Sequence, residues 1–341
     1  MGNPVLVERT RGNLVESFHN GSICIVNQTG DTIFSLGDIN QLSFTRSALK
    51  PFQSIALIET GAAKAFKLSD AEIAVTCGSH NAEIEHLQAV NSILNKIGLT
   101  KTSLKCGPQL PTGKIPRNEL RKSGAKPEHI HNNCSGKHAG FLAICVHMNW
   151  PTENYLAENH PLQKLIKQIC AQMFEVSIND FVLGEDGCSA PNYATSLYQQ
   201  AVAYKNLVSG NHSEKRNNSC KKIVDACLSY PLMVAGSDRY CTDIIKAANG
   251  HILGKTGADG VFCMALPKLG YGIAIKIDDG KMGPQYFVAQ AIIKALGIKL
   301  KNELHQYQES SVINWNKHNV GIQRCSLNLT NQLKTISSLK H

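Results

Sequence analysis

The chain has 341 residues, of which 43% are hydrophobic and 18% charged, a composition typical of a soluble globular protein with a substantial core. Its net charge of +9 is not gathered into basic runs and aromatic residues make up only 6%, so we expect no nucleic-acid partner. The sequence shows neither a signal peptide nor an apolar stretch of the roughly 20 residues that cross a membrane. We therefore expect a cytoplasmic protein without a membrane partner, whose twelve cysteines are reduced thiols.

The first forty residues alternate as β-strands do, with SICIVN and TIFSLG separated by the turn signal QTGD. From Ser47 the apolar residues recur every three or four positions, which predicts a helix with Pro51 in its first turn. Residues 102–133 are rich in Pro, Gly and Lys and are expected to form an extended loop. Residues 207–222 are polar and are expected to form a solvent loop, and the remaining middle segments read as helices.

The last third returns to strand patterns in HILGKTG, VFCMALP and YGIAIKIDDG, followed by an apolar helix in PQYFVAQAIIKALG. This order predicts an α+β fold, in which one antiparallel sheet is built from residues of about 5–40 and 250–280, with flanking helices and a helical middle. We expect a single catalytic domain over residues 1–325 and a polar C-terminal tail over residues 326–341.

Ser47 and Lys50 are three residues apart at the head of the first predicted helix, so their side chains share one face. A serine at a helix N-terminus lies beside orphan N–H groups that can stabilise an oxyanion, and a neutral lysine can act as its base. By itself the S-x-x-K pattern is weak, because such short matches occur by chance.

Two further elements strengthen the pattern. Ser79 stands in CGSHN, and Lys255 stands in GKTG on a predicted strand. Serine β-lactamases and penicillin-binding proteins carry S-x-x-K, then S-x-N, then K-T-G in this chain order. In that arrangement Ser47 attacks, Lys50 accepts its proton, Ser79 passes protons and Lys255 supplies a second positive charge.

Other motifs separate the chain from the lactamases, among them TRSALKPFQ, TCGSHNAEIEH, NNCSGKHAGFL, GEDGCSAPNYA and GKTGADGVF. Over about residues 5–325 they resemble the L-asparaginase II family of the rhizobial type. The resemblance implies hydrolysis of L-asparagine to L-aspartate and ammonia by a homodimer, on a fold akin to serine β-lactamases and glutaminases. It also matches Ser47, Lys50, Ser79 and Lys255 to the family's catalytic group. The residues implied to contact substrate are Arg46, His80, Thr256 and Gly257, although Arg46 could equally be structural.

Two cysteines suggest a second site. Cys134 and Cys188 could bind zinc together with a third donor, but without a C-x-x-C pair two separately buried thiols would be the simpler interpretation. The resemblance implies one Zn²⁺ per chain on Cys134, Lys137 and Cys188. We expect His138 and Asp186 around it, and Cys241 matches a family position near the pocket, although it could equally be a small core residue.

Two alternatives stay open. The same fold could serve a glutaminase or a β-lactam-reactive enzyme, since one methylene is worth only roughly 1–3 kcal/mol of discrimination. A non-catalytic zinc-binding or thiol-redox protein built on Cys134 and Cys188 is the third hypothesis, but it leaves the three lactamase-like elements unexplained.

Overall fold

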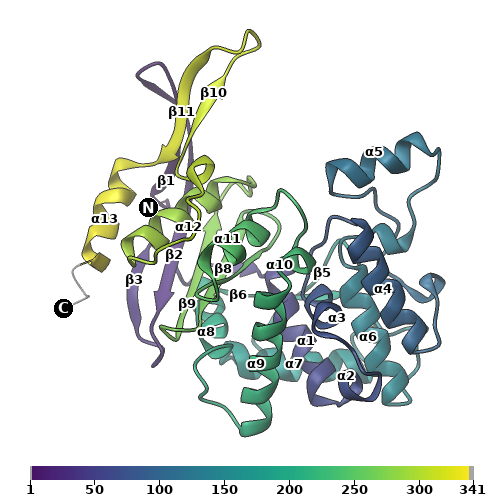
Figure 1. Ribbon diagram of the computed structural model, residues 1–341. Coiled ribbons are helices and arrows are strands. Elements are labelled where there is room, and N and C mark those ends of the chain that lie inside the picture. Colours follow the sequence, from purple (N-terminus) through teal and green to yellow (C-terminus); the bar gives the residue numbers. More distant parts are fainter. Residues whose placement is uncertain (1, 338–341) are drawn as a thin grey trace. The chain divides into compact units, whose positions relative to one another are not determined.

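The computed structural model describes residues 2–337 and divides the chain into two compact units (Figure 1). Unit 1 comprises residues 1–48, 195–205 and 247–341, and unit 2 comprises residues 49–194 and 206–246. One boundary between the two units falls between Ala48 and Leu49. It separates the predicted pair, because Ser47 belongs to unit 1 and Lys50 to unit 2.

Unit 1 contains an antiparallel sheet whose strands come from both ends of the chain. The strand order is β10-β11-β1-β2-β9-β8-β7, with β3 pairing alongside β2. This confirms the predicted α+β fold, because alternating strand patterns near both termini meet in one sheet. The strands are β1 (Val5–Arg11), β2 (Leu14–Val26), β3 (Thr32–Leu36), β7 (Leu253–Thr256), β8 (Val261–Leu266), β9 (Tyr271–Ile277), β10 (Glu309–Ile313) and β11 (Asn319–Cys325).

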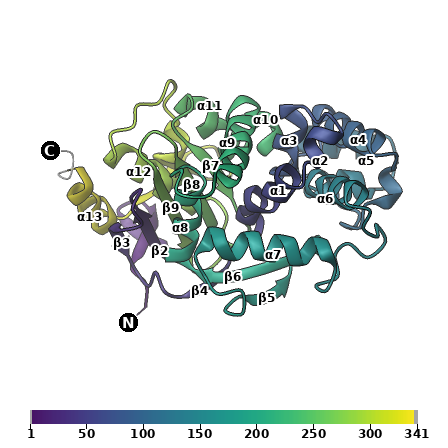
Figure 2. The same ribbon diagram turned by 90° about the horizontal axis from the view of Figure 1, so that it is seen from below.

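Helices cover this sheet within unit 1. Helix α12 (Pro284–Ala295) packs on β9, β1, β11 and β8, and α13 (Leu327–Ser337) packs on β1 and α12 (Figures 1 and 2). Helix α13 falls in the segment expected to be a polar tail. Leu329, Leu333 and Ile336 are buried at a helical spacing, so three apolar residues hold an otherwise polar segment on the sheet. Unit 1 also contains β4 (Leu42–Phe44), η1 (Arg46–Leu49), α8 (Leu197–Asn206) and η4 (His305–Tyr307).

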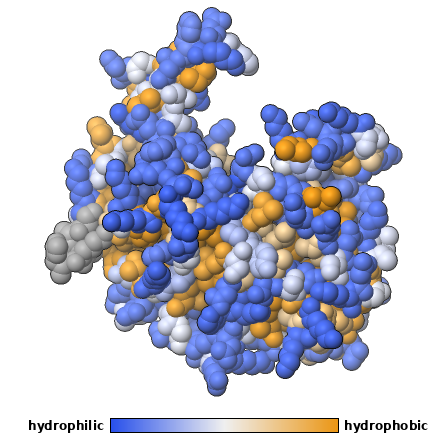
Figure 3. Space-filling view, in the orientation of Figure 1, coloured by the Kyte–Doolittle hydropathy of each residue, from blue (hydrophilic) through white to orange (hydrophobic). Residues whose placement is uncertain are grey.

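Apolar side chains are exposed where the β10–β11 hairpin and the β1–β2 turn project from the rest of unit 1 (Figure 1). Trp315, in the β10–β11 turn, is 100% exposed, and Leu14 and Phe18 on β2 and Ile313 on β10 are also exposed. Figure 3 shows hydrophobic surface among hydrophilic surface on this projection.

Unit 2 is mainly helical, and α1 packs on α6, α7, α9 and α3. Hairpin β5–β6 is its antiparallel element, with Val182 opposite Ala194. Its elements are α1 (Lys50–Glu59), α2 (Ala62–Ala65), α3 (Asp70–Thr76), α4 (Ile84–Lys96), η2 (Lys101–Ser103), α5 (Lys114–Lys122), η3 (His129–His131), α6 (Ser135–His147), α7 (Pro161–Phe174), β5 (Val182–Glu185), β6 (Pro191–Ser196), α9 (Glu214–Ser229), α10 (Pro231–Val234) and α11 (Tyr240–Ala248).

Two segments of unit 2 differ from the sequence prediction. The expected loop at 102–133 contains α5, and the expected solvent loop at 207–222 includes the first half of α9. Ser213 caps α9 by accepting the Arg216 backbone N–H, and Cys220 and Ile223 lie on its buried face. Polar residues dominate both helices, since α5 buries none of its residues and α9 buries only one face.

None of the helices in residues 2–337 combines the length and the apolar character that a membrane span requires. The cysteines are thiols in this structure and all but Cys325 are buried.

Two glycines let α6 pack closely on α3. A Cβ on Gly136 would lie 2.4 Å from the Val75 carbonyl oxygen, a distance that side-chain carbons do not adopt. A Cβ on Gly140 would lie 3.0 Å from a Thr76 methyl carbon. The first contact is with backbone, which cannot yield without moving the end of α3.

We expect Gly136→Ala to destabilise the protein by roughly 1–3 kcal/mol, because overpacking outweighs the gain in helix propensity of about 1 kcal/mol. Gly187→Ala is the control, since a Cβ there would meet nothing within 4 Å. Urea unfolding of the three proteins measures the difference. A Gly136→Ala protein as stable as the parent would show that α3 and α6 are not in close contact.

Candidate active site

Lys50 begins α1 and is buried, with 1% of its surface exposed. Its Nζ donates to the Gly78 carbonyl at 2.6 Å, to Ser79 Oγ at 2.9 Å and to the Asn133 carbonyl at 3.4 Å. Pro51 follows in the first turn, where the missing N–H costs no hydrogen bond. The structure thus brings Lys50 and Ser79 together, two of the residues that the sequence singled out.

Ser79 lies in the loop that follows α3, and close packing fixes this loop. A Cβ on Gly78 would lie 2.3 Å from the Met233 carbonyl oxygen, so only glycine fits there. The Ser79 N–H donates to the Val234 carbonyl at 2.9 Å. Both contacts come from α10, which therefore sets the position of the Ser79 side chain against Lys50.

His80 is fully buried and stacks on His86, with ring centroids 5.1 Å apart. His80 Nδ1 accepts the Ala82 N–H at 3.1 Å, so its proton is on Nε2, which donates to Ser135 Oγ at 2.9 Å. His86 repeats this pattern, accepting the Glu83 N–H at Nδ1 and bonding the Leu232 carbonyl through Nε2. Both rings are neutral in this arrangement.

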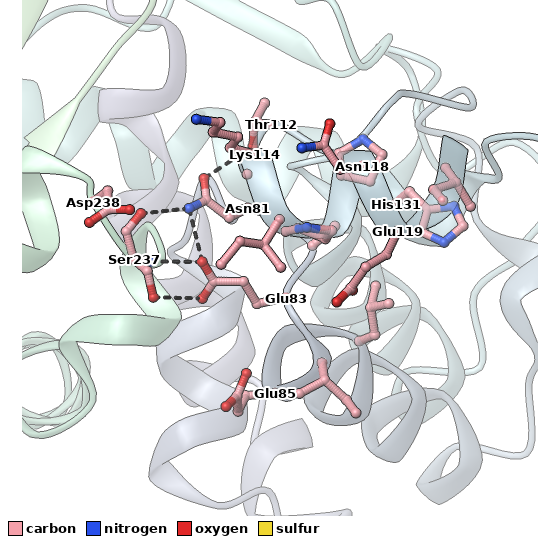
Figure 4. A pocket seen from close by; sticks show the side chains of 18 of the residues that line it. Asn81, Glu83, Glu85, Thr112, Lys114, Asn118, Glu119, His131, Ser237 and Asp238 are labelled. Atoms are coloured by element: carbon pink, nitrogen blue, oxygen red, sulfur yellow. Dashed lines mark hydrogen bonds between the residues drawn. The ribbon is translucent and has the colours of Figure 1, made fainter. Parts of the chain in front are cut away.

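Asn81, the third residue of the S-x-N element, binds two loops together. Its Oδ1 accepts from Arg239 at 2.9 Å, and its Nδ2 donates to Glu83 at 3.1 Å and to the Ser237 carbonyl at 2.9 Å. It also lines a cavity of about 1180 Å³ between α4 and α5 (Figure 4). Lys50 is not among the residues that line this cavity.

In unit 1, Ser47 lies on η1 beside the K-T-G strand. A Cβ on Gly257 would lie 2.7 Å from the Thr45 carbonyl oxygen, which places the start of η1 against the end of β7. Lys255 is buried on β7, and its Nζ donates to the Thr256 carbonyl at 2.9 Å. The structure thus brings the segment of Ser47 to the K-T-G element within unit 1.

Arg46 and Thr256 have identifiable partners within unit 1. Arg46 forms an ion pair with Asp259, in the loop after β7. Thr256 Oγ1 and the Tyr286 hydroxyl lie 3.2 Å apart. Arg46 and Thr256 thus each contact another side chain of unit 1.

A cluster of thiols lies at the start of α6. Donor atoms of Cys134, Asp186 and Cys188 all lie within 4.8 Å of one another. Lys137 Nζ lies 3.0 Å from Cys188 Sγ. His138 lies one residue further along α6, and its Nδ1 bonds the Tyr155 hydroxyl at 2.7 Å. Cys241 is buried in α11 and is not part of this group.

The charges of this cluster are unequal. A hydrogen bond from Cys134, with the Lys137 charge, lowers the pKa of Cys188 far below its usual range, while burial opposes this shift. The same hydrogen bond and burial raise the pKa of Cys134. Burial would lower the pKa of Lys137, but the charges of Cys188 and Cys134 raise it overall. The surroundings thus favour the charged forms of Cys188 and Lys137, whose Sγ and Nζ atoms lie 3.0 Å apart.

Sequence reasoning missed three residues of these sites. Asn133 supplies a carbonyl to Lys50, Tyr155 holds His138, and Asp259 holds Arg46. Asn133 stood inside a quoted motif beside Cys134, so its proximity could have been inferred. Asp259 also stands inside a quoted motif, GKTGADGVF, but nothing in the sequence pointed to Arg46 as its partner. Tyr155 carries no local signal.

Residues 7–325, nearly the whole chain, match a family of amidohydrolases. That family is L-asparaginase II, and the chain belongs to it. Membership supports an amidohydrolase acting on a small molecule. No curated protein matched the sequence of the chain.

Several solved structures resemble the chain distantly. The native form of Mglu has 12% identity and a TM-score of 0.48, with 89% of this chain and 71% of that chain covered. A β-lactamase (Mb2281c) from Mycobacterium bovis has 10% identity and a TM-score of 0.41, with coverages of 78% and 89%. A Bacillus glutaminase has 13% identity and a TM-score of 0.33, with coverages of 77% and 85%. Similarities this distant carry no conclusion about activity.

The stacked histidines predict loss of stability in acid. Burial lowers the pKa of both His80 and His86 from 6.5, and Glu83 opposes this only partly for His86. The unfolded chain therefore binds protons that the folded chain resists, so this stability is complete above about pH 6.5 and is lost as the pH falls through the lowered values. Each proton contributes a slope of up to about 1.4 kcal/mol per pH unit.

Urea unfolding between about pH 7.5 and pH 5 measures this slope. His86→Gln should flatten it, because one titrating ring is removed. His305→Gln is the control, since that side chain is 77% exposed. Equal slopes in His86→Gln and the parent would contradict the prediction.

Proposed function

We propose that this protein hydrolyses L-asparagine to L-aspartate and ammonia through a covalent ester on Ser47. The observation that carries the proposal is the buried Lys50 amine at the start of α1, hydrogen-bonded to Ser79 Oγ in a chain of the L-asparaginase II family. Ser47 precedes Lys50 by three residues on η1, which leads directly into α1. A serine, a lysine and a second hydroxyl suffice for nucleophilic catalysis with proton relay.

In the first step Ser47 Oγ attacks the side-chain amide carbon and its proton passes to Lys50, whose Nζ must first have released one of the three protons that it donates in this structure. The new C–O bond forms as the carbonyl π electrons move to oxygen. Backbone N–H groups, including that of Ser47, and the N-terminal dipole of α1 stabilise the resulting oxyanion. Lys255 contributes the second positive charge.

In the second step the C–N bond breaks and the leaving nitrogen takes a proton through Ser79, so ammonia departs. Water then attacks the ester, gives a proton back along the same relay and releases aspartate, which restores the Ser47 hydroxyl. The 2.9 Å contact between Lys50 Nζ and Ser79 Oγ supports this relay, because it is already of hydrogen-bond length.

We expect Ser47→Ala to lower the rate of ammonia release from L-asparagine by at least about 10³-fold, because the nucleophile is lost. Ser35→Ala, at an exposed position on β3, is the control and should keep the parent rate. Near-parental turnover in Ser47→Ala would overturn the mechanism.

The same assay with L-glutamine and a chromogenic cephalosporin separates the alternatives. Turnover of glutamine above asparagine by the parent protein would make it a glutaminase. Turnover of the cephalosporin alone would make it a β-lactam hydrolase, in both cases with Ser47 as nucleophile.

We further propose that Cys134, Lys137 and Cys188 hold one Zn²⁺ per chain. Two sulfur donors and the Asp186 carboxylate within 4.8 Å of one another suit this ion. His138 lies beside Cys188 as well, and its hydrogen bond with Cys188 opposes the burial that lowers its pKa. Lys137 would coordinate only after losing its proton, which a metal charge beside the same thiolates would promote. Bound zinc would supply a Lewis acid that shapes the pocket and orients substrate.

We expect the parent protein to retain about one zinc per chain after dialysis, and Cys188→Ala to retain much less, because this variant lacks one of the two sulfur donors of the cluster. Cys170→Ala is the matched control, because that thiol is equally buried in α7. Elemental analysis measures the content without reference to activity. Zinc retained in full by Cys188→Ala would refute the site.

We also propose a homodimer and a cytoplasmic location. The exposed apolar side chains on the β1–β2 and β10–β11 projection support self-association, since a second copy would cover them. Both statements remain predictions.

A further inference from the structure

The residue before Ser47 has a strained backbone. Arg46 has φ of +49°, in the left-handed region that costs a non-glycine residue about 1–2 kcal/mol. Such strain persists only where surrounding contacts hold it, and it clusters at functional sites. The next question is which contacts hold this turn.

One side of the turn is held by an ion pair. The Arg46 guanidinium bonds the Asp259 carboxylate across the loop that follows β7. Asp259 is itself fixed, because Lys276 Nζ donates to its carbonyl at 2.7 Å. Asp259 also has φ of +55°, so two left-handed residues face each other through their side chains.

The backbone on either side of Ser47 is fixed as well. The Thr45 carbonyl packs against Gly257, where any side chain would clash. The Ala48 carbonyl accepts a 2.8 Å hydrogen bond from the hydroxyl of Tyr204, which is buried on α8. Ser47 therefore lies between two carbonyl groups that contacts hold in place, those of Thr45 and Ala48. Arg46, with its strained backbone, connects Thr45 to Ser47.

We propose that the Arg46–Asp259 pair is a positioning device that holds Ser47 in its attacking orientation. The inference rests on the proposed function, in which Ser47 is the nucleophile. It gives Arg46 the structural role that the sequence analysis left open beside substrate contact. Asp259 then becomes a residue of the reaction that no sequence motif had assigned.

The pair stabilises the fold little, since its side chains are 28% and 65% exposed and such pairs contribute at most about 1 kcal/mol. Its effect on the orientation of Ser47 is much larger, because a displacement of about 1 Å can cost 10²-fold in rate. A positioning role therefore predicts a large loss of serine reactivity with little loss of stability.

The test is the rate at which a fluorophosphonate labels Ser47, followed by mass spectrometry of the full-length protein. In that reaction the serine oxygen bonds to phosphorus, the P–F bond breaks, fluoride leaves and the hydroxyl proton passes to the base. The reagent has no carboxylate, so a substrate-binding role for Arg46 would not change this rate. Thermal unfolding is measured on the same samples.

We expect Asp259→Ala to label Ser47 roughly 10–100-fold more slowly than the parent with nearly unchanged unfolding. Asp259→Glu should recover part of the rate. Glu16→Ala, which breaks the exposed Arg11–Glu16 pair of the same unit, is the control and should label at the parental rate.

Arg46→Gly and Arg46→Ala separate the backbone from the side chain. Glycine adopts positive φ without strain, so Arg46→Gly should label faster than Arg46→Ala, although it removes more of the side chain. Parental labelling in Asp259→Ala, or equal rates in the two Arg46 variants, would overturn the positioning role alone. A parent protein that is folded but unlabelled at Ser47 would overturn the nucleophile and this inference together.

Discussion

The arrangement of unit 2 depends on the burial of one amine. Lys50 has 1% of its surface exposed, and a polar group at that depth must be hydrogen-bonded or the fold loses several kcal/mol. Its acceptors come from the loop after α3 and from Asn133, just before α6. Helices α1, α3 and α6 therefore have to converge, and Gly78 and Gly136 allow their backbones to approach closely enough.

The same convergence brings the amine near the thiol cluster. The Asn133 carbonyl accepts from Lys50, and its side-chain oxygen accepts from the Cys134 thiol at 3.1 Å. One residue thus joins the candidate base to the candidate metal site. The two candidate sites therefore share the peptide segment at Asn133.

Patterns local to the sequence predicted the sheet and the contact between Lys50 and Ser79. Alternating residues near both termini define the strands of the sheet. The order of three short motifs implied that their residues share one site. Helices α5 and α9 were missed because polar residues outnumber apolar residues in both. Asp259 was missed because it pairs with a residue 213 positions away, and no periodicity links positions so distant.

The exposure of Trp315 determines how unfolding of this protein can be observed. The chain has two tryptophans, and Trp315 in unit 1 is 100% exposed, so its emission is already that of an indole in water. Trp150 in unit 2 packs edge-on against His160, with centroids 6.4 Å apart. In a single copy of the chain, tryptophan fluorescence therefore follows the loss of structure around Trp150. In the proposed homodimer, which covers the projection that carries Trp315, tryptophan emission would report dissociation as well.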